Sequence, residues 1–511
     1  MAAKAKAKKT KAVAEKAKPA KAPKATKPAA KKASKKAAKP ETAAPAPSLA
    51  AMYAGIVDNI DKSLNLRKGN ARMLKPISTG LLVPDYVTGG GINSTFTMIS
   101  GEKASGKTTL SMMGLAASVR ANVPLVIMID AEGTISLDYS ESVFQSFDIG
   151  DVFENGRARY YNNNIIEDVS AYLAGIVRKL PDKVYLEEEK TWAYAVPKGP
   201  NGTEMVARLE KAGLKPDRKL SASGSGKTWY FPTSYDGSEA VVIVDSWAAM
   251  IPRSLDETEG DLAGGMAVNA RAFSKELPRF VGSLKQKGIA VWSINQLRND
   301  PGVRYGDPLK EKGGEALQFA AGIMCRTYSR AVPQGLVRDK EAYGLEIEPS
   351  ITKKGGHDRY AWKQFVNTKN KFGRPFLKGY MRVWVANAEG KARGFDPVQD
   401  TMEFLSLTGQ ISGPRKKLKI TLRPGVKAPP SLAFLDKRTL TYMEFKLLIL
   451  AAHMKGNAEL VKQSKATFKT DRAPDLRAHL FRQLREDKTL WASQVSDGKS
   501  SEEESEAETD E

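Results

Sequence analysis

Short apolar runs alternate with longer amphipathic stretches between about residue 77 and residue 410. The runs are rich in β-branched and aromatic residues and read TFTMIS, LVIMID, AVVIVD, IAVWSIN, AAGIMCRTY, QFVNTKN and MRVWVA. Runs of this kind separated by helical stretches are typical of a mainly parallel sheet covered by helices. We therefore expect residues 77–410 to form one α/β domain.

Residues 181–236 interrupt the alternation. This stretch is polar, is punctuated by Gly and Pro, and stands where a single short connection would suffice. We interpret it as an insertion or small subdomain. Residues 415–495 are basic and favour helices, with TLTYMEFKLLILAAHM as the clearest one, and we expect a small helical C-terminal domain there.

A further helix is expected ahead of the α/β domain, in a segment of helix and linker at 48–76. Ser48 is a suitable N-cap after the string APAP. Apolar side chains then recur at helical spacing, at Leu49, Met52, Tyr53, Ile56, Ile60 and Leu64. The helix has one apolar face, which needs a partner.

The net charge of +22 is unevenly spread. Residues 1–50 hold fifteen Lys and two Glu, whereas residues 502–511 hold seven acidic residues. We expect disordered tails at 1–47 and 496–511, because like charges in blocks repel each other. The basic arm favours a polyanion such as nucleic acid; a solubilising tail is the alternative. The absence of Arg from it disfavours a transit peptide.

The single cysteine and the lengths of the apolar runs indicate the cellular compartment. Cys325 lies in an apolar run, where we expect a buried strand residue, and a single cysteine forms no disulfide within the chain. No apolar run reaches the roughly 20 residues that span a bilayer, and the N-terminus lacks the apolar segment of a signal peptide. We expect a soluble, cytoplasmic protein.

The string SGKT occurs twice, and its first copy has the context of a phosphate-binding loop. The pattern Gly-x-x-x-x-Gly-Lys-Thr is met by Gly101, Gly106, Lys107 and Thr108, between an apolar run and a helical stretch. Small residues let backbone N–H groups approach phosphate, the Lys reaches the β- and γ-phosphates, and the hydroxyl takes one position on Mg²⁺. The predicted ATP-binding residues are Gly101, Glu102, Lys103, Ala104, Ser105, Gly106, Lys107, Thr108 and Thr109.

The second copy, within ASGSGKTWYFP at 222–232, lacks that context. Ser221 takes the place of the first Gly, no strand is expected before it, and an aromatic run follows where a helix should start. We interpret it as a flexible Gly/Ser loop.

Two acidic residues end apolar runs. Asp245 ends AVVIVD and Glu132 follows LVIMIDA. Parallel strands bring their carboxyl ends to the edge of the sheet where a phosphate loop lies. Asp245 is therefore the expected Mg²⁺ ligand beside Thr108, and Glu132 the expected general base. Taken singly, either carboxylate could instead be a helix cap.

These residues add up to a resemblance. The strings ISTGLLVPDYVTGGGI, GEKASGKTTL, IDAEG, VVIVDS, SINQLRNDPGVRYGDP, GGEALQFAAGI and NTKNKFGRPF follow the order and spacing of the RecA family of homologous-recombination ATPases. The resemblance covers about 48–410 apart from the insertion. The basic tail and the insertion look more like a diverged phage version, similar to the UvsX type.

The resemblance implies roles for further residues near the nucleotide. Glu132 would be the catalytic base, and Gln296 would sense the γ-phosphate and begin a DNA-binding loop. Tyr139 would stack on adenine, although Ser136 replaces the acid expected nearby. Lys369 and Lys371 would reach the ATP of a neighbouring subunit, or would otherwise be solvated surface lysines.

The resemblance also places two DNA-binding loops, at about 256–266 and 297–314. The first is acidic and Gly-rich, with Met266 and Arg271 at family positions, and Pro278 is expected to kink the following helix. The second combines cations with apolar and aromatic groups, as single-strand sites do. Its expected DNA-binding residues are Arg298, Val303, Arg304, Tyr305, Gly313 and Gly314. Pro301 replaces the usual aliphatic wedge, which Val303 could supply.

The resemblance implies a DNA-dependent ATPase that forms filaments on single-stranded DNA with ATP and Mg²⁺, pairs it with homologous duplex and exchanges strands. Helix 48–64 would dock on the next subunit, and single-strand-binding and mediator proteins would be further partners. A ring-forming helicase with a RecA core and an architectural DNA-binding protein with a vestigial ATPase are the alternatives.

Overall fold

The computed structural model describes residues 72–145, 152–153, 156–222, 227–256, 265–299, 308–329, 359–386, 394–414, 416–453, 456–487 and 490. They all belong to one unit of the chain, Gly69–Glu511. The predicted helix at 48–64 and both charged tails lie outside the described residues. Among the helices that are described, none is long and apolar enough to cross a membrane.

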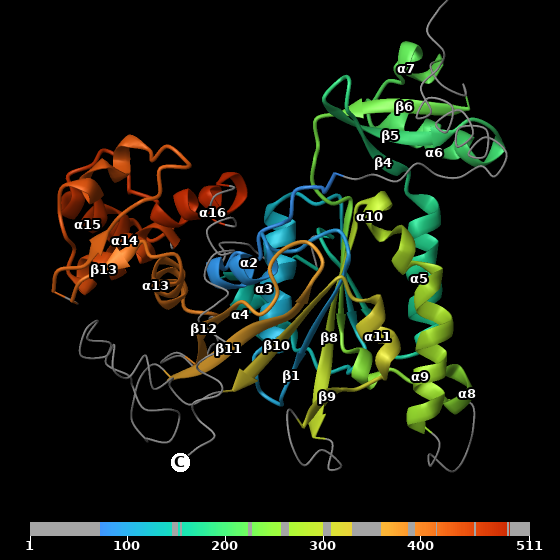
Figure 1. Ribbon diagram of the computed structural model, residues 1–511, viewed down its shortest axis with the longest axis horizontal. Coiled ribbons are helices and arrows are strands. Elements are labelled where there is room, and N and C mark those ends of the chain that lie inside the picture. Colours follow the sequence, from blue (N-terminus) through green and yellow to red (C-terminus); the bar gives the residue numbers. More distant parts are fainter. Residues whose placement is uncertain are drawn as a thin grey trace, which may run out of the picture. The chain divides into compact units, whose positions relative to one another are not determined.

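A large sheet forms the centre of this unit (Figure 1). Its strands run in the order β12-β11-β10-β1-β8-β7-β2-β3. The segment from β10 to β3 is parallel throughout, which confirms the predicted mainly parallel α/β fold. The bounds are β1 Phe96–Gly101, β2 Leu125–Asp130, β3 Arg159–Asn162, β7 Ala240–Asp245, β8 Ile289–Asn299, β10 Ile323–Ser329, β11 Arg359–Asn370 and β12 Lys378–Ala386.

The last two predicted strands depart from the parallel pattern. β11 pairs antiparallel with β10, and β12 pairs antiparallel with β11. A short strand, β9 (Leu309–Glu311), pairs antiparallel with the end of β8. Antiparallel neighbours need no helical crossover to reach the next position in the sheet.

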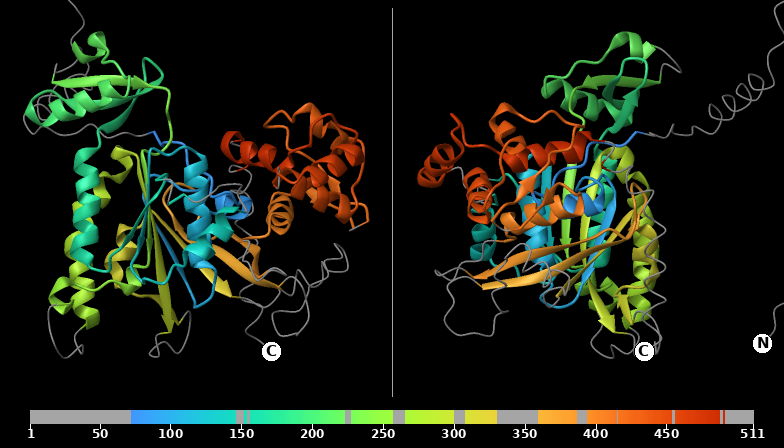
Figure 2. Two further views of the ribbon diagram at one scale, coloured as in Figure 1. Left: turned by 180° about the vertical axis from the view of Figure 1, so that it is seen from behind. Right: turned by 60° about the vertical axis from the view of Figure 1, so that its left-hand side comes forward.

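Helices cover both faces of the sheet (Figures 1 and 2). In β7, Val241 and Ile243 join the core on the α3 side, whereas Val242 and Val244 join the core that contains α5 and α9. Burial on both faces explains why the strand sequences are continuously apolar rather than alternating. The helices flanking the sheet are α3 Lys107–Arg120, α4 Leu137–Gln145, α5 Ile166–Lys179, α8 Arg253–Asp256, α9 Gly265–Glu276, α10 Leu284–Lys287 and α11 Glu315–Ala320.

One close approach fixes α3 on the sheet. A Cβ added to Gly114, in the middle of α3, would lie 2.1 Å from the ring of Trp292 on β8. Both residues are in the core, where Trp292 is fully buried. Glycine is thus required at this helix position, because any larger residue would push α3 away from the sheet.

The insertion is folded rather than a run of loops. It forms a three-stranded antiparallel sheet in the order β4-β5-β6, with two helices. The bounds are β4 Asp182–Leu186, β5 Thr191–Pro197, α6 Pro200–Lys211, α7 Arg218–Ala222 and β6 Thr228–Thr233. Its own small core contains Tyr194, Val196 and Phe231.

Buried ion pairs attach the insertion to the main unit. Lys183 on β4 is fully buried and donates to Glu239, just ahead of β7, at 2.5 Å. Burial lowers the pKa of Lys183, and Glu239 acts in the opposite direction. Asp182 pairs with Lys287 of α10 at 2.7 Å. A paired charge at this depth is costly to separate from its partner, so these contacts hold the insertion at a fixed place on α10 and β7.

The C-terminal segment packs on two helices of the main unit. Its elements are β13 Ile411–Ser412, β14 Lys419–Ile420, α14 Tyr442–His453, α15 Ala458–Phe468 and α16 Leu476–Glu486. Its apolar residues, such as Phe445 and Leu480, belong to the same continuous core as α3. The two helices of the main unit on which it packs are α2 (Leu82–Thr88) and α13 (Pro397–Leu407).

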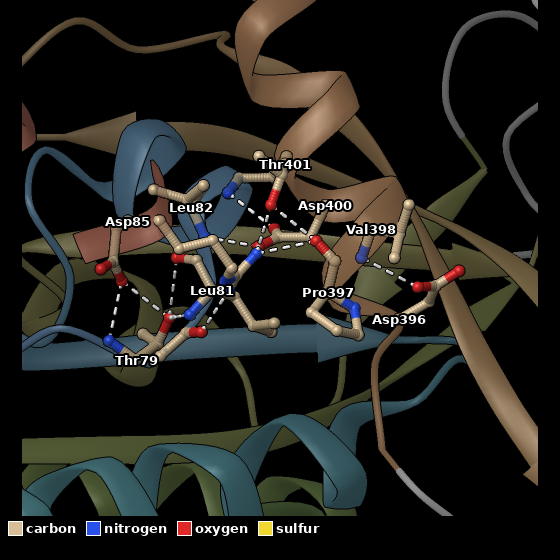
Figure 3. Close-up of polar contacts among 12 residues, drawn as sticks. Thr79, Leu81, Leu82, Asp85, Asp396, Pro397, Val398, Asp400 and Thr401 are labelled. Carbon is tan, nitrogen blue, oxygen red and sulfur yellow. Dashed lines mark hydrogen bonds and ion pairs between the residues drawn. The ribbon is translucent and has the colours of Figure 1, made fainter. Parts of the chain in front are cut away.

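A buried polar network joins these helices (Figure 3). Asp400 on α13 accepts hydrogen bonds from the backbone N–H groups of Leu82 and Val83 at 2.9 and 3.0 Å, and so caps the N-terminus of α2. Arg477 of α16 donates to Asp400 at 2.8 Å. Asp85 is buried within α2 and accepts from Ser78 and Thr79. This network links α2 to two segments, around Asp400 and Arg477, that lie more than 300 residues further along the chain.

Candidate active site

The first SGKT string forms a loop between β1 and α3, as its spacing predicts. β1 ends at Gly101 and α3 begins at Lys107. Gly106 has a φ of +88°, and a Cβ added to Gly101 would lie 2.2 Å from Thr327 Oγ1. Glycine is therefore needed at both positions. No side chain caps the N-terminus of α3, which leaves its first N–H groups available to an anion.

Lys107 and Thr108 project from the first turn of α3 toward neighbouring groups. The Lys107 ammonium donates to the carbonyl oxygens of Gly101 and Glu102 at 3.1 and 2.7 Å. Burial lowers the pKa of Lys107, while Asp245, Glu132 and Glu102 oppose that shift. A positive charge is thus held within the loop, where a phosphate would lie.

Asp245 lies beside Thr108. It is the last residue of β7, and the Thr108 hydroxyl donates to its Oδ2 at 2.7 Å. Burial raises the pKa of Asp245 to about 6, and the nearby carboxylates Glu132 and Asp130 add to the effect. Such a carboxylate is stabilised by a cation, since opposite charge favours its ionised form.

Glu132 and Gln296 meet across two strands. Gln296 on β8 donates from Nε2 to Glu132 Oε1 at 3.0 Å. The hydroxyl of Ser246, directly after β7, donates to the same oxygen at 2.6 Å. The Glu132 side chain is otherwise exposed, so its second oxygen can face a water molecule. The structure brings the predicted Glu132, Gln296, Lys107, Thr108 and Asp245 together at one edge of the sheet.

Asp130 holds the Glu132 segment in place and was missed in the sequence. Its carboxylate accepts from the backbone N–H groups of Glu132, Gly133 and Ile135 at 2.8 to 3.1 Å. The Tyr160 hydroxyl donates to it at 2.7 Å. The signal was present, because Asp130 ends the apolar run LVIMID just as Asp245 ends AVVIVD.

Lys363 is a second lysine at the phosphate loop that the sequence pattern did not reveal. It comes from β11 and donates to the Ala104 carbonyl and the Ser329 hydroxyl, both at 2.6 Å. Ala104 has a φ of +58°, an uncommon backbone conformation for a residue with a side chain. Burial lowers the pKa of Lys363, and the charge of Lys107 adds to the effect. Lys363 thus fixes the outer turn of the loop.

The residues present fit ATP with Mg²⁺. Mg²⁺ in nucleotide sites commonly takes one or two protein oxygens together with phosphate oxygens. The Thr108 hydroxyl and the Asp245 carboxylate are hard oxygen ligands in direct contact. The uncapped start of α3 and the Lys107 ammonium suit the phosphates.

Tyr139, the expected adenine partner, lies on α4 and hydrogen bonds to Thr109 of the loop helix. Burial raises the pKa of Tyr139. Its ring is partly buried against the core on the α3 side. The contact places Tyr139 next to the loop, and the stacking role remains a proposal.

Lys369 and Lys371 lie away from this edge. Lys369 pairs with Met324 on β10, whereas the β10 residue next to Gly101 is Thr327. Roughly 10 Å of strand separates these two levels. Lys369 donates to the Gln318 carbonyl at 2.7 Å, and Lys371 is exposed. The structure therefore does not bring these two lysines to the phosphate loop of the same chain.

The segment at 297–314, predicted as a loop, is a β-hairpin at its base. Arg298 pairs with Lys310, and Leu297 with Glu311. Backbone hydrogen bonds between β8 and β9 explain the difference, because a Gly/Pro-containing tip does not prevent pairing of its flanks. Val303, Arg304 and Tyr305 lie outside the described residues. Burial lowers the pKa of Lys312, the nearby charge of Arg298 adds to the effect and Glu132 opposes it, so two basic side chains lie near each other at the hairpin base.

Gly313 and Gly314 follow the hairpin, with φ values of +98° and +79°. A Cβ on Gly314 would lie 3.0 Å from Ala270 on α9, the helix that carries the exposed Arg271. The end of the second predicted DNA segment therefore contacts the helix that follows the first one. The side chain of Met266 and most of the first loop lie outside the described residues.

Pro278 ends a helix rather than kinking it. α9 stops at Glu276, and a 3₁₀ turn follows at Leu277–Arg279. Proline lacks the N–H that a continuing helix would need.

The second SGKT string has different neighbours. The residues around it belong to α7 and β6, so a strand follows where a phosphate loop would open a helix. Lys227 is exposed, in the insertion. The expectation that this copy is not a phosphate loop agrees with its flanking elements.

Comparisons with known proteins point to one family. Residues 234–353 match the RecA N-terminal domain. Protein RecA from Synechocystis sp. (strain ATCC 27184 / PCC 6803 / Kazusa) is 26% identical over 311 residues, 60% of this chain and 68% of that protein. Protein RecA from Synechococcus elongatus is 26% identical over 60% of this chain and 67% of its own length. Protein RecA from Thermus thermophilus is 30% identical over 176 residues, 34% of this chain and 44% of that protein.

These matches support a recombinase role in DNA recombination and repair, and they agree with the mainly parallel sheet and the loop at 101–109. The predicted phage origin and UvsX likeness stay predictions. The chain is similar to proteins of the RecA family.

Proposed function

We propose that the protein is an ATP- and DNA-dependent recombinase that assembles on single-stranded DNA and exchanges its strand with a homologous duplex. The observation that carries this proposal is the contact between Glu132 and Gln296. Gln296 continues directly into Arg298 and the hairpin of β8 and β9. One strand thus joins the candidate catalytic carboxylate to the candidate DNA-binding segment.

Within the phosphate loop each side chain has a defined task. ATP with Mg²⁺, held by Lys107, Thr108 and Asp245, would supply the phosphoryl group that is transferred. Glu132 would take a proton from the attacking water, which requires the free carboxylate oxygen beside the one bonded by Gln296 and Ser246. Asp130 would position Glu132 by bonding to its backbone N–H.

Coupling to DNA follows from the same hydrogen bonds. The backbone carbonyl of Gln296 accepts from Lys312 N at 3.0 Å, and Asn295 donates to the Lys312 carbonyl at 2.8 Å. Lys312 directly precedes Gly313 and Gly314. A shift of the hairpin on binding DNA would therefore move Gln296 and change its contact with Glu132. Hydrolysis that depends on DNA is the expected result.

The lysines at 369 and 371 support a filament. They cannot reach the loop of their own chain through the register of β10 and β11. A head-to-tail assembly would place them over a neighbour's ATP, where cations stabilise transition-state charge. Hydrolysis would then need two subunits in contact.

Electron microscopy on circular single-stranded DNA, with Mg²⁺ and a slowly hydrolysed ATP analogue, tests this proposal alongside an ATPase assay. Helical filaments and DNA-stimulated hydrolysis are expected. Closed rings with duplex unwinding would favour a helicase with the same core. DNA binding without hydrolysis would favour an architectural protein.

A mixing experiment tests the shared site. Lys107→Ala and the double variant Lys369→Ala/Lys371→Ala should each be inactive alone. An equal mixture should regain activity, because about one interface in four would then combine an intact loop with intact lysines. No recovery in mixed filaments would show that each chain hydrolyses ATP by itself.

A further inference from the structure

One edge of the insertion carries a cluster of cations that the proposed ATPase does not use. Arg218 and Lys219 are exposed at the start of α7, and Lys215 is exposed just ahead of them. The Lys198 ammonium, at the end of β5, donates to the carbonyl of Ser221 in α7 at 2.8 Å. We call Lys198, Lys215, Arg218 and Lys219 the basic edge.

The fold of the insertion holds this edge in a defined place. The Asp217 N–H donates to the Tyr230 carbonyl on β6 at 2.9 Å, and Ser221 Oγ accepts from Tyr230 N at 3.1 Å. These bonds fix α7 against the sheet on either side of Arg218 and Lys219. The basic edge is thus part of an ordered surface, joined to the main unit through Lys183 and Glu239.

In the described part of the chain, other cations of this region form ion pairs with nearby carboxylates, unlike three cations of the basic edge. Lys179 and Arg208 both pair with Glu204. Among the described residues, by contrast, no carboxylate forms an ion pair with Lys215, Arg218 or Lys219. The nearby Asp217 instead accepts from the backbone N–H groups of Lys219 and Leu220. A concentrated positive charge of this kind attracts a polyanion.

The surroundings of Trp229, an aromatic residue at this edge, indicate which kind of nucleic acid the edge would bind. Single-strand sites offer open aromatic rings on which bases stack. The Trp229 ring is instead covered by the Lys198 ammonium, 4.2 Å from its centre, and it packs against the insertion core. Among the described residues of the basic edge, cations are thus available to phosphate while the Trp229 ring is taken up by Lys198, which suits the backbone of a duplex.

We propose that the basic edge of the insertion binds the sugar-phosphate backbone of duplex DNA, independently of its sequence. The inference rests on the proposed function in one respect, namely that the duplex is the one with which a recombinase filament pairs. It gives the insertion the task of gathering duplex next to the main unit. The surface lies outside both DNA segments that the family resemblance implies.

The triple variant Lys215→Ala/Arg218→Ala/Lys219→Ala tests the proposal in the full-length protein. Binding to a fluorescein-labelled duplex of about 40 base pairs and to labelled oligo(dT) is measured by anisotropy at several salt concentrations. Duplex affinity should fall about fivefold or more, and the slope of log affinity against log salt should weaken by about 2 to 3, because each lost phosphate contact removes about 0.9. Affinity for oligo(dT) should stay within about twofold.

The matched control is Lys179→Ala/Lys190→Ala/Arg208→Ala, which removes the same charge from exposed positions elsewhere in and beside the insertion. Lys198 is left in place because it packs on Trp229. A conservative variant, Lys215→Arg/Lys219→Arg, should retain duplex affinity and exclude a folding defect. Circular dichroism of all variants provides the same check.

Two results would overturn the proposal. In one, the triple variant loses no more duplex affinity than the control. In the other, it loses oligo(dT) and duplex binding equally, which would assign the edge to nucleic acid in general. Failure of the proposed function is seen separately, as wild-type protein that forms no filament and hydrolyses no ATP on single-stranded DNA.

Discussion

The two SGKT strings show how much the surroundings of a motif decide. The first lies between a buried parallel strand and a helix of the central sheet, and the second lies between a short helix and a strand of a small antiparallel sheet. Around Lys107 the sheet edge supplies Asp245, Glu132 and Gln296, while Lys227 is exposed in the insertion. The same four letters therefore belong to the candidate site in one region, whereas in the other they are flanked by a short helix and an antiparallel strand.

A phosphate loop of this kind needs the carboxyl edge of a parallel sheet beside it. Neighbouring parallel strands end together, so their terminal side chains converge on the loop. The antiparallel sheet of the insertion has no such shared end, because its strands alternate in direction.

The largest difference is expected between the two lysines of the strings. Lys107→Ala should lower ATP hydrolysis by about a thousandfold or more, since the positive charge at the phosphates is lost. Lys227→Ala should leave it within about twofold. A steady-state ATPase assay with single-stranded DNA measures both, and equal losses would refute the assignment of the loop.

Replacement of the candidate base should have the next largest effect. Glu132→Gln should reduce the maximal rate of hydrolysis about a hundredfold to a thousandfold, because an amide accepts no proton from water. Nucleotide binding should persist, since Lys107, Thr108 and Asp245 are unchanged. Single-turnover assays measure the rate of hydrolysis, and binding of a fluorescent ATP analogue measures nucleotide affinity separately. A variant with normal turnover would assign proton removal to another group.

A pair of core substitutions compares the stability of the two regions. Phe231 is fully buried in the insertion and Phe96 is fully buried in the central sheet. Truncation of either to Ala should cost about 3 to 5 kcal/mol. For Phe231→Ala the loss should be confined to the insertion and leave ATPase activity intact, whereas Phe96→Ala should destabilise the catalytic sheet as well.

Hydrogen exchange and an ATPase assay on each variant measure this contrast. If Phe231→Ala inactivated the enzyme as fully as Phe96→Ala, the insertion and the sheet would unfold as one unit.

Lys363 should affect nucleotide affinity more than turnover. Lys363→Met removes two charged hydrogen bonds that hold Ala104 and Ser329, so the KM for ATP should rise about tenfold with kcat within about twofold. The exposed Lys378 on the neighbouring strand is the control, as Lys378→Met. A fall in kcat at constant KM would instead give Lys363 a part in the chemical step.

The last prediction concerns pH and the network outside the site. Burial raises the pKa of Asp85 to about 7, from 3.8 in the unfolded chain. Between about pH 4 and about pH 7, the Asp85 carboxyl is protonated in the folded state and ionised in the unfolded state. The contribution of Asp85 is therefore most favourable below about pH 4 and falls by about 1.4 kcal/mol per pH unit up to about pH 7.

Asp85→Asn removes this dependence, so the free-energy difference between wild type and variant should change steadily as the pH rises from about 5 to about 7 and level off above that. Urea unfolding at a series of pH values measures it. A difference that is constant with pH would mean that Asp85 keeps an ordinary pKa.

Much of the site could be predicted from local patterns. The loop at 101–109 has fixed spacing, and Asp245, Glu132 and Gln296 stand at the ends of apolar runs, so the sheet alone brings them together. Asp130 had the same signal as Asp245 and was overlooked. Ser246 and Lys363 gave no signal, because their partners are decided by side-chain contacts across 114 and 259 residues of sequence.

The alternation of strands and helices, the phosphate loop and the resemblance to a family could be predicted from the residues alone, because each depends on residues close together in the chain. Only the tertiary structure decided that the insertion folds on its own core, that the segment after Gln296 is a hairpin, and that Asp400 and Arg477 fasten the C-terminal segment to α2. Strand pairing and buried ion pairs depend on which distant segments meet. A polar, Gly-rich stretch such as 181–236 shows its turns in the sequence, but the pairing between them exists only in the folded chain.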